Sequence, residues 1–151
     1  MRTSDTPSSS SIQSPHAARV IRVLIADDER DVVLTLSAIL RDEGYEVKGV
    51  HSGRDAIVAV ADFEPHVVIA DIAMPERSGW DVARVVRATQ PSGRLDRPLL
   101  IAISGMYRQS ADRILAEITG FNYFLAKPFD PKVLLSLLPP VTPPAIDSSS
   151  Q

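Results

Sequence analysis

The fold is decided by a unit that first appears at Val20–Arg41, VIRVLIADDERDVVLTLSAILR. Its first seven residues, VIRVLIA, are mostly apolar and predict a buried strand. Glu29–Arg41 then carries its aliphatic side chains at helical spacing, which predicts an amphipathic helix. The acidic residues Asp27, Asp28 and Glu29 stand where the strand gives way to the helix. The unit is therefore a strand, an acidic turn and a helix.

Four more strand-and-helix pairs follow along the chain. The expected strands are Tyr45–Val50, His66–Ala70, Leu99–Ile103 and Tyr123–Ala126, and the expected helices are Arg54–Phe63, Ser78–Thr89, Ser110–Thr119 and Pro131–Leu138. Apolar strands that alternate with helices are typical of a parallel sheet covered on both faces. Right-handed crossovers leave few topologies for five strands. The sequence therefore predicts an α/β protein with a doubly wound, five-stranded parallel sheet and five helices.

The two ends of the chain differ in composition from its middle. Residues 1–18 contain six serines and two prolines, and residues 139–151 contain four prolines and three serines. Such segments bury too little apolar surface to offset the entropy lost on ordering them. We therefore expect disordered tails at 1–18 and 139–151 around one domain at 19–138.

Composition argues against several classes of protein. The chain has no cysteine, which rules out disulfides, thiolate zinc sites and a cysteine nucleophile. A net charge of −3 argues against a general nucleic-acid surface. No apolar run approaches the roughly 20 residues needed to span a bilayer, and residues 1–15 lack the apolar core of a secretory signal. We expect a cytoplasmic protein without nucleic-acid or membrane partners.

Polar side chains follow four of the five expected strands. Asp27 and Asp28 follow the first strand, Asp71 the third, Ser104 the fourth and Lys127 the fifth. In an open parallel α/β sheet, ligands bind beyond these carboxyl ends. Clustered carboxylates repel one another and favour a hard cation such as Mg²⁺, while the ammonium and the hydroxyl suit phosphoryl oxygens. The pattern predicts a site where one carboxylate attacks phosphorus and forms an acyl phosphate.

Four segments carry a resemblance to a known family. They are VLIADDE (23–29), DIAMPERSGW (71–80), AISG (102–105) and KPF (127–129). In this order, at the ends of strands, they resemble the receiver domain of two-component response regulators over nearly all of Arg19–Leu138. The resemblance implies a flavodoxin-like sheet of order 2-1-3-4-5. It also implies that Asp71 accepts a phosphoryl group from a histidine kinase or a histidine phosphotransfer protein.

The same resemblance assigns the metal ligands. It implies a Mg²⁺ site formed by Asp28, Asp71 and the backbone carbonyl of Ala73, with Asp27 assisting. Many receivers have a polar side chain at the position of Ala73, so we expect slow or atypical loss of the phosphoryl group.

The phosphoryl ligands and the switch are assigned in the same way. Ser104 and Lys127 would hold phosphoryl oxygens, and the Lys127–Pro128 peptide would be cis. Ser104 and Phe124 would form the conformational switch, which alters the face made by the fourth helix, fifth strand and fifth helix. A downstream protein would bind that face, and the chain would be a monomer or a weak homodimer.

Simpler interpretations of these residues remain open at this point. Asp27 and Asp28 can cap the following helix, Asp71 can form an Asx-turn, and Lys127 can be a solvated strand end. Ser104 can be a turn residue and Phe124 a core residue. Arg84, Arg87, Arg94 and Arg97 are expected on a solvated face.

Three other functions compete with a stand-alone, phosphorylated receiver. The first is a Mg²⁺-dependent phosphatase or phosphotransferase for small molecules, which often needs a second carboxylate where Ala73 stands. The second is an adaptor that works without phosphorylation. The third is a receiver cut from, or adjoining, a hybrid kinase. Because only thirteen residues follow the last expected helix, we expect no DNA-binding module in this sequence.

Overall fold

The computed structural model describes residues 20–89, 98–105 and 120–141, and Ile21–Pro139 forms a compact unit. Its five strands are all parallel and form one sheet in the order β2-β1-β3-β4-β5. The strands are β1 (Arg22–Ala26), β2 (Glu46–Val50), β3 (Val67–Asp71), β4 (Leu99–Ser104) and β5 (Tyr123–Ala126). The predicted sheet and its strand order are confirmed.

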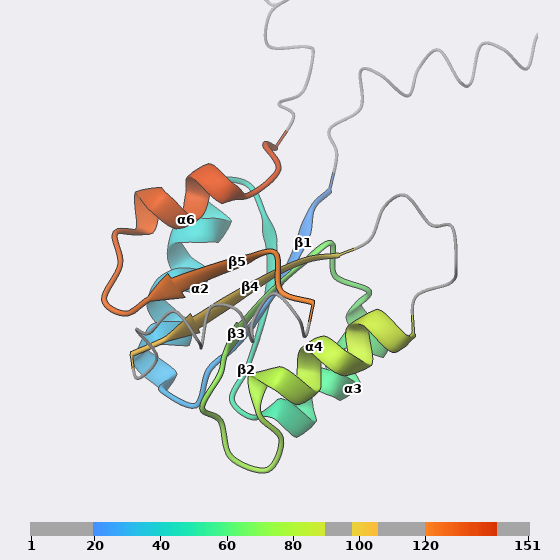
Figure 1. Cartoon of the computed structure of the whole chain (residues 1–151). Helices are drawn as coiled ribbons and strands as arrows, with labels where there is room; N and C mark the ends of the chain where they lie inside the picture. Colours follow the sequence, from blue (N-terminus) through green and yellow to red (C-terminus); the bar gives the residue numbers. More distant parts are fainter. Residues whose placement is uncertain (1–19, 90–97, 106–119, 142–151) are drawn as a thin grey trace, which may run out of the picture. The chain divides into compact units, whose positions relative to one another are not determined.

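Helices cover both faces of this sheet. The described helices are α2 (Arg30–Asp42), α3 (Gly53–Phe63), α4 (Gly79–Ala88) and α6 (Pro131–Leu137). Figure 1 shows α2 and α6 on one face and α3 and α4 on the other, so the sheet is doubly wound. The expected helix Ser110–Thr119 lies outside the described residues. Within the described ranges, no helix is long and apolar enough to cross a membrane.

Strands β3 and β4 each end one residue later than the sequence indicated. Asp71 pairs with Ile103 and Ser104 pairs with Ala126 in the parallel ladder. The backbone carbonyl of Ser104 also accepts a hydrogen bond of 2.9 Å from the amide of Lys127. Asp71 and Ser104 are therefore the last residues of their strands, and the rigid sheet, instead of a loop, positions both side chains.

The turn after Asp71 folds back tightly on the strand end. The amide of Gly79 donates to the carbonyl of Ile72 at 3.0 Å, and a Cβ atom at Gly79 would lie 2.6 Å from the carbonyl oxygen of Asp71. Ser78 and Asp81 form a capping box that begins α4 at this point. Glycine is required at residue 79 because the helix start and the strand end are in backbone contact.

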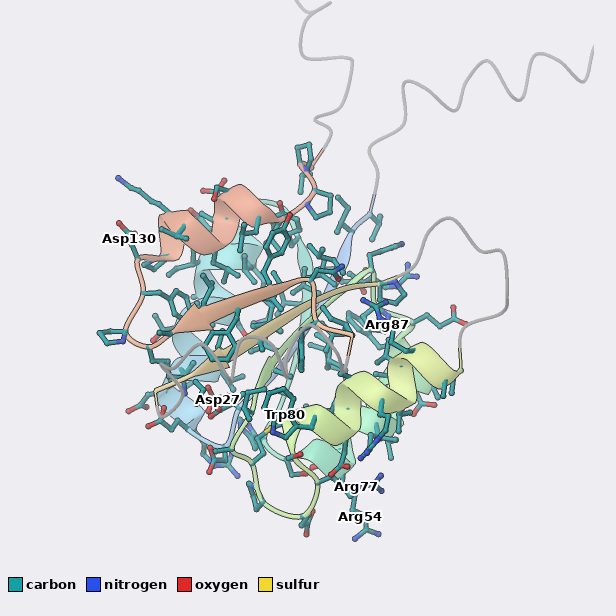
Figure 2. The ribbon with its side chains drawn as sticks, viewed as in Figure 1. Asp27, Arg54, Arg77, Trp80, Arg87 and Asp130 are labelled. Atoms are coloured by element: carbon teal, nitrogen blue, oxygen red, sulfur yellow. The ribbon has the colours of Figure 1, made fainter. Side chains whose placement is uncertain are left out.

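Arg87 holds the opposite end of the sheet. Its guanidinium donates to the Gly120 carbonyl at 2.7 and 3.1 Å, to the Pro98 carbonyl at 3.0 Å and to Asn122 Oδ1 at 3.0 Å. Figure 2 shows Arg87 beside the starts of β4 and β5, far from Asp27 at the other end of the strands. The expectation that Arg87 lies on a solvated face is wrong, because α4 directs it onto backbone carbonyls. Arg94 and Arg97 lie outside the described residues.

Replacing Arg87 should destabilise the domain more than replacing another arginine of the same helix. We expect Arg87→Ala to lower the free energy of unfolding by about 2 kcal/mol, since it removes charge-assisted hydrogen bonds to partly buried carbonyls. Arg84 is exposed and pairs only with Asp81 among the described residues, so Arg84→Ala should cost less than about 1 kcal/mol. Urea unfolding of both variants measures the difference, and equal losses would contradict the role given to Arg87.

Candidate functional site

Lys127 lies at the centre of a cluster of carboxylates at the carboxyl ends of the strands. Its Nζ atom is 2.8 Å from Asp27 Oδ2, 2.9 Å from Glu29 Oε1 and 3.3 Å from Asp71 Oδ2. The side chain of Lys127 is only 17% exposed. The peptide between Lys127 and Pro128 is cis, as the resemblance implied. One ammonium therefore joins carboxylates that come from the ends of β1 and β3.

Asp27 is the most buried of these carboxylates, with 0% of its side chain exposed. Its Oδ1 atom accepts a hydrogen bond of 2.9 Å from the backbone amide of Glu29. Its Oδ2 atom forms the ion pair with Lys127 and has no hydrogen-bond partner among the described residues. A buried carboxylate oxygen with spare acceptor capacity is suited to a cation.

Asp71 is also buried, and each of its oxygens has a different role. Oδ1 accepts a hydrogen bond of 3.1 Å from the amide of Ala73, and Oδ2 faces Lys127. Burial and the charge of Asp27 raise the pKa of Asp71 from its usual 3.8 to about 6, although Lys127 and the Ala73 amide act in the opposite direction. Ionisation of Asp71 at neutral pH therefore costs free energy in the folded chain. A further positive charge nearby would reduce this cost.

The ammonium of Lys127 is held in its charged form. Burial, the largest single effect, lowers its pKa, but the contacts with Asp27 and Glu29 and the charges of Asp27 and Asp71 outweigh burial and raise the pKa above that of a free lysine. Lys127 therefore acts as a permanent positive charge at the site.

Three of the carboxylates can share a cation. One oxygen from each of Asp27, Asp28 and Asp71 lies within 4.8 Å of the other two. Asp28 is exposed, whereas Asp27 and Asp71 are buried, so the group is open to solvent on one side. An all-oxygen donor set that keeps one open side suits Mg²⁺, which retains several water ligands in most protein sites.

The remaining site residues lie around this cluster. Ser104 is buried at the end of β4, one residue beyond the position that pairs with Asp71. Ala73 is exposed, and its amide binds Asp71. Phe124 pairs with Ala102 in the sheet and packs, partly buried, against the core between the sheet, α3 and α4. All of these residues except Phe124 lie at or beside the carboxyl edge of the sheet, whereas Phe124 lies within β5.

The geometry decides between the alternative interpretations of the charged residues. Glu29, not Asp27 or Asp28, is the N-cap residue of α2, and it makes no side-chain capping hydrogen bond, so the capping interpretation is wrong. Asp71 does bond the amide two residues ahead, as an Asx-turn residue does, but its second oxygen faces Lys127. Lys127 is mostly buried and ion-paired, so it is not a solvated strand end.

Sequence reasoning assigned no role to two residues that contact the cluster. Glu29 reaches Lys127 from the start of α2, and Nδ1 of His51 lies 3.3 Å from the carbonyl of Asp27. The third acid in the stretch Asp27-Asp28-Glu29 was a signal for the first of these contacts. His51 follows β2, the strand next to β1, and only the strand order reveals that it lies beside Asp27.

A doubly wound sheet with three carboxylates and a lysine at its carboxyl edge defines a receiver type of protein. Comparison with known families agrees: residues 23–139 match the model of the response regulator receiver domain. The chain belongs to the response regulator receiver domain family. As a receiver domain it is not a conventional enzyme, and receiver domains pair with histidine kinases.

Individual relatives share the domain but differ in total length. The chain is 30% identical over 115 residues to the DNA-binding response regulator MtrA of Mycolicibacterium paratuberculosis, and the match covers 76% of this chain and 48% of that protein. The chain therefore spans about half the length of this relative. The shared part is the receiver domain, and the other half of MtrA has no counterpart in the match.

Solved structures match across nearly their whole length. Chemotaxis response regulator CheY4 of Vibrio cholerae is 25% identical, with a TM-score of 0.70, and the match covers 79% of this chain and 96% of that one. A putative response regulator from Chloroflexus aurantiacus is 28% identical, with a TM-score of 0.69, and the match covers 79% and 94%. A CheY-like receiver domain from Methanospirillum hungatei shares the fold at 22% identity, with a TM-score of 0.70, over 79% and 90%.

The raised pKa of Asp71 predicts how stability changes with pH when no divalent cation is present. Between about pH 4 and 6 the unfolded chain loses this proton before the folded chain does, so stability falls as pH rises through this window and stays lower above it. Asp71→Asn has no such proton to lose. In EDTA at pH 7.5 we expect it to be more stable than the wild type by about 1–2 kcal/mol, after allowance for solvent screening.

Urea unfolding between pH 4 and 8 measures how much more stable Asp71→Asn is than the wild type. The gain should shrink towards pH 4, because the folded chain then keeps the proton on Asp71 and no longer holds a buried charge there. Asp62→Asn, at an exposed position of α3, controls for the loss of one carboxylate. If the Asp71→Asn variant is no more stable than wild type at pH 7.5, ionised Asp71 is not held at a cost.

Proposed function

We propose that this chain is a phosphoacceptor response regulator, which takes a phosphoryl group from a histidine kinase or phosphotransfer protein onto Asp71. The observation that carries the proposal is the placement of Asp71 Oδ2 at 3.3 Å from Lys127 Nζ, with Asp27 and Asp28 beside it. A carboxylate that is buried, close to a fixed cation and near a metal-binding group has the features of an acceptor for phosphorus.

The chain's own residues position the reacting groups. The Ala73 amide holds Oδ1 of Asp71, which orients the carboxylate and leaves Oδ2 towards the cluster. Lys127 provides a positive charge for an oxygen of the incoming phosphoryl group, and buried Ser104 provides a hydroxyl on the neighbouring strand. The Asp71 oxygen attacks phosphorus, and the donor leaves with the electron pair of the broken bond.

Mg²⁺ would be held by Asp27, Asp28, Asp71 and the backbone carbonyl of Ala73. When bound, it supplies positive charge that lowers the repulsion among the carboxylates and neutralises phosphoryl oxygens. The three carboxylate oxygens within 4.8 Å and the spare acceptor capacity of Asp27 Oδ2 support this assignment.

The output of the switch would be a change in protein contacts. Phosphorylation adds about 1.5 to 2 negative charges and three acceptor oxygens at the strand ends. Ser104 would bond one of these oxygens, and Phe124 would then turn further into the core against which it packs. The face that includes β5 and α6 would bind a downstream protein or a second copy of the chain. The helix that completes this face, expected at 110–119, lies outside the described residues.

Phosphorylation by a small donor tests the proposal without knowledge of the partner kinase. Incubation with acetyl phosphate and Mg²⁺ should add one phosphoryl group to the wild type and none to Asp71→Ala, because the attacking oxygen is lost. Excess EDTA should slow the reaction at least tenfold, and peptide mapping by mass spectrometry should place the group on Asp71. Undiminished phosphorylation of Asp71→Ala, beside an Asp62→Asn control, would refute the assignment of the acceptor.

The exposed alanine at residue 73 predicts a long-lived phosphoryl group. An alanine side chain cannot hydrogen-bond a water molecule that attacks phosphorus, so spontaneous dephosphorylation should be slow. Ala73→Asn places an amide beside that water and should speed the loss of phosphate several-fold. The measurement follows the phosphorylated fraction with time after removal of the donor. Identical rates for Ala73→Asn and the wild type would remove this explanation.

A further inference from the structure

The ammonium of Lys127 is closely surrounded by carboxylates. An ammonium offers three N–H donors, and three carboxylates surround this one: Asp27 at 2.8 Å, Glu29 at 2.9 Å and Asp71 at 3.3 Å. An incoming phosphoryl oxygen would be a fourth acceptor. Nζ donates hydrogen bonds to Glu29 and Asp71, so a phosphoryl oxygen that approaches Lys127 competes with these carboxylates for its N–H groups.

The three carboxylates differ in how easily they can leave. Asp27 is fully buried, and its other oxygen binds the Glu29 amide. Asp71 is the proposed acceptor and must stay close to phosphorus. The Glu29 side chain is 64% exposed, so its carboxylate can return to water with little desolvation penalty. Glu29 is the carboxylate that can be released at the least cost.

Glu29 occupies a position where a different residue would favour the helix. It is the N-cap residue of α2 but makes no side-chain capping hydrogen bond, and Ser, Thr, Asp or Asn would be preferred there. Its backbone is fixed by the hydrogen bond from its own amide to Asp27. The longer glutamate side chain forms an ion pair with Lys127 instead of a capping hydrogen bond. A departure from local preference at this place is consistent with a role at the site.

We propose that Glu29 is a positioning residue that competes with the phosphoryl group for Lys127. In the unphosphorylated chain it holds one Nζ donor, and it releases that donor to water as the phosphoryl group arrives. Glu29 thereby slows phosphorylation and stabilises the unphosphorylated state. This inference rests on the proposed function, because it assumes that Asp71 is the acceptor.

The rate of phosphorylation by acetyl phosphate tests the inference. In this reaction an Asp71 oxygen forms a bond to phosphorus while the bond from phosphorus to the acetyl oxygen breaks, and acetate leaves with the electron pair. Glu29→Gln keeps the length of the side chain but not its charge. We expect its second-order rate constant, measured at saturating Mg²⁺ titrated for each variant, to be about two- to fivefold above wild type, as suits an exposed ion pair.

Two further variants separate the contact from its side effects. Asp31 is an exposed acid in the first turn of α2, and among the described residues it has no contact with Lys127. Asp31→Asn removes its charge, and its rate should equal that of the wild type. Glu29→Asp keeps the charge but is one methylene shorter and is a preferred N-cap residue. It should raise both the rate, because the contact is lost, and the melting temperature, because α2 gains a cap.

The outcomes distinguish the inference from the function on which it rests. If the wild type is phosphorylated on Asp71 and Glu29→Gln reacts at the same rate or more slowly, the inference is overturned while the proposed function stands. The inference is also overturned if the rate constant of Asp31→Asn rises as much as that of Glu29→Gln, or if that of Glu29→Asp does not rise. Either result assigns the effect to net charge and not to the contact with Lys127. If Asp71 of the wild type is not modified at all, the proposed function itself fails.

Discussion

The ion pairs of Lys127 with Asp27 and Asp71 are the interaction on which the site depends. The two carboxylates come from the ends of neighbouring strands, β1 and β3, and both are buried. Without a nearby cation, their mutual repulsion and their desolvation would both oppose ionisation. Lys127 reaches them from the end of β5, beyond the intervening β4. The order of the strands therefore sets the electrostatics of the site, because only a long side chain from β5 can cross Ser104 to reach both acids.

Contacts elsewhere in the sheet hold these charged residues at fixed positions. Asp71 and Ser104 are the last residues of paired strands, so ladder hydrogen bonds fix the positions of their Cα atoms. Gly79 lets α4 begin in contact with the backbone of Asp71, and Arg87 ties the far ends of β4 and β5 to the same helix. A shift of the strands at either end would change the distances of about 3 Å between Lys127 and the carboxylates. The electrostatic energy of a charge pair depends most steeply on distance in this range.

Much of this arrangement could be predicted from sequence. Short apolar runs identified five strands, and the side chains that follow them identified Asp27, Asp28, Asp71, Ser104 and Lys127 as neighbours, because parallel strands share one carboxyl edge. The parts that could not be predicted depend on how far a side chain reaches. The sequence suggests a solvated Arg87 because its partners, Pro98 and Gly120, are 11 and 33 residues away and bind it through backbone carbonyls that carry no sequence signal. The contact of Glu29 with Lys127, 98 residues apart, has the same origin.

One cation among four acidic side chains leaves the site short of positive charge. Asp27, Asp28, Glu29 and Asp71 outnumber Lys127, and the raised pKa of Asp71 shows that Lys127 does not fully compensate for burial and for Asp27. A domain selected only for stability would lose an acid here, because replacing a repelled buried carboxylate with a neutral residue is favourable. Under the proposed function, the excess negative charge would instead give a divalent cation its affinity and keep Asp71 a capable nucleophile. The same imbalance would then set stability against the proposed function at this edge of the sheet.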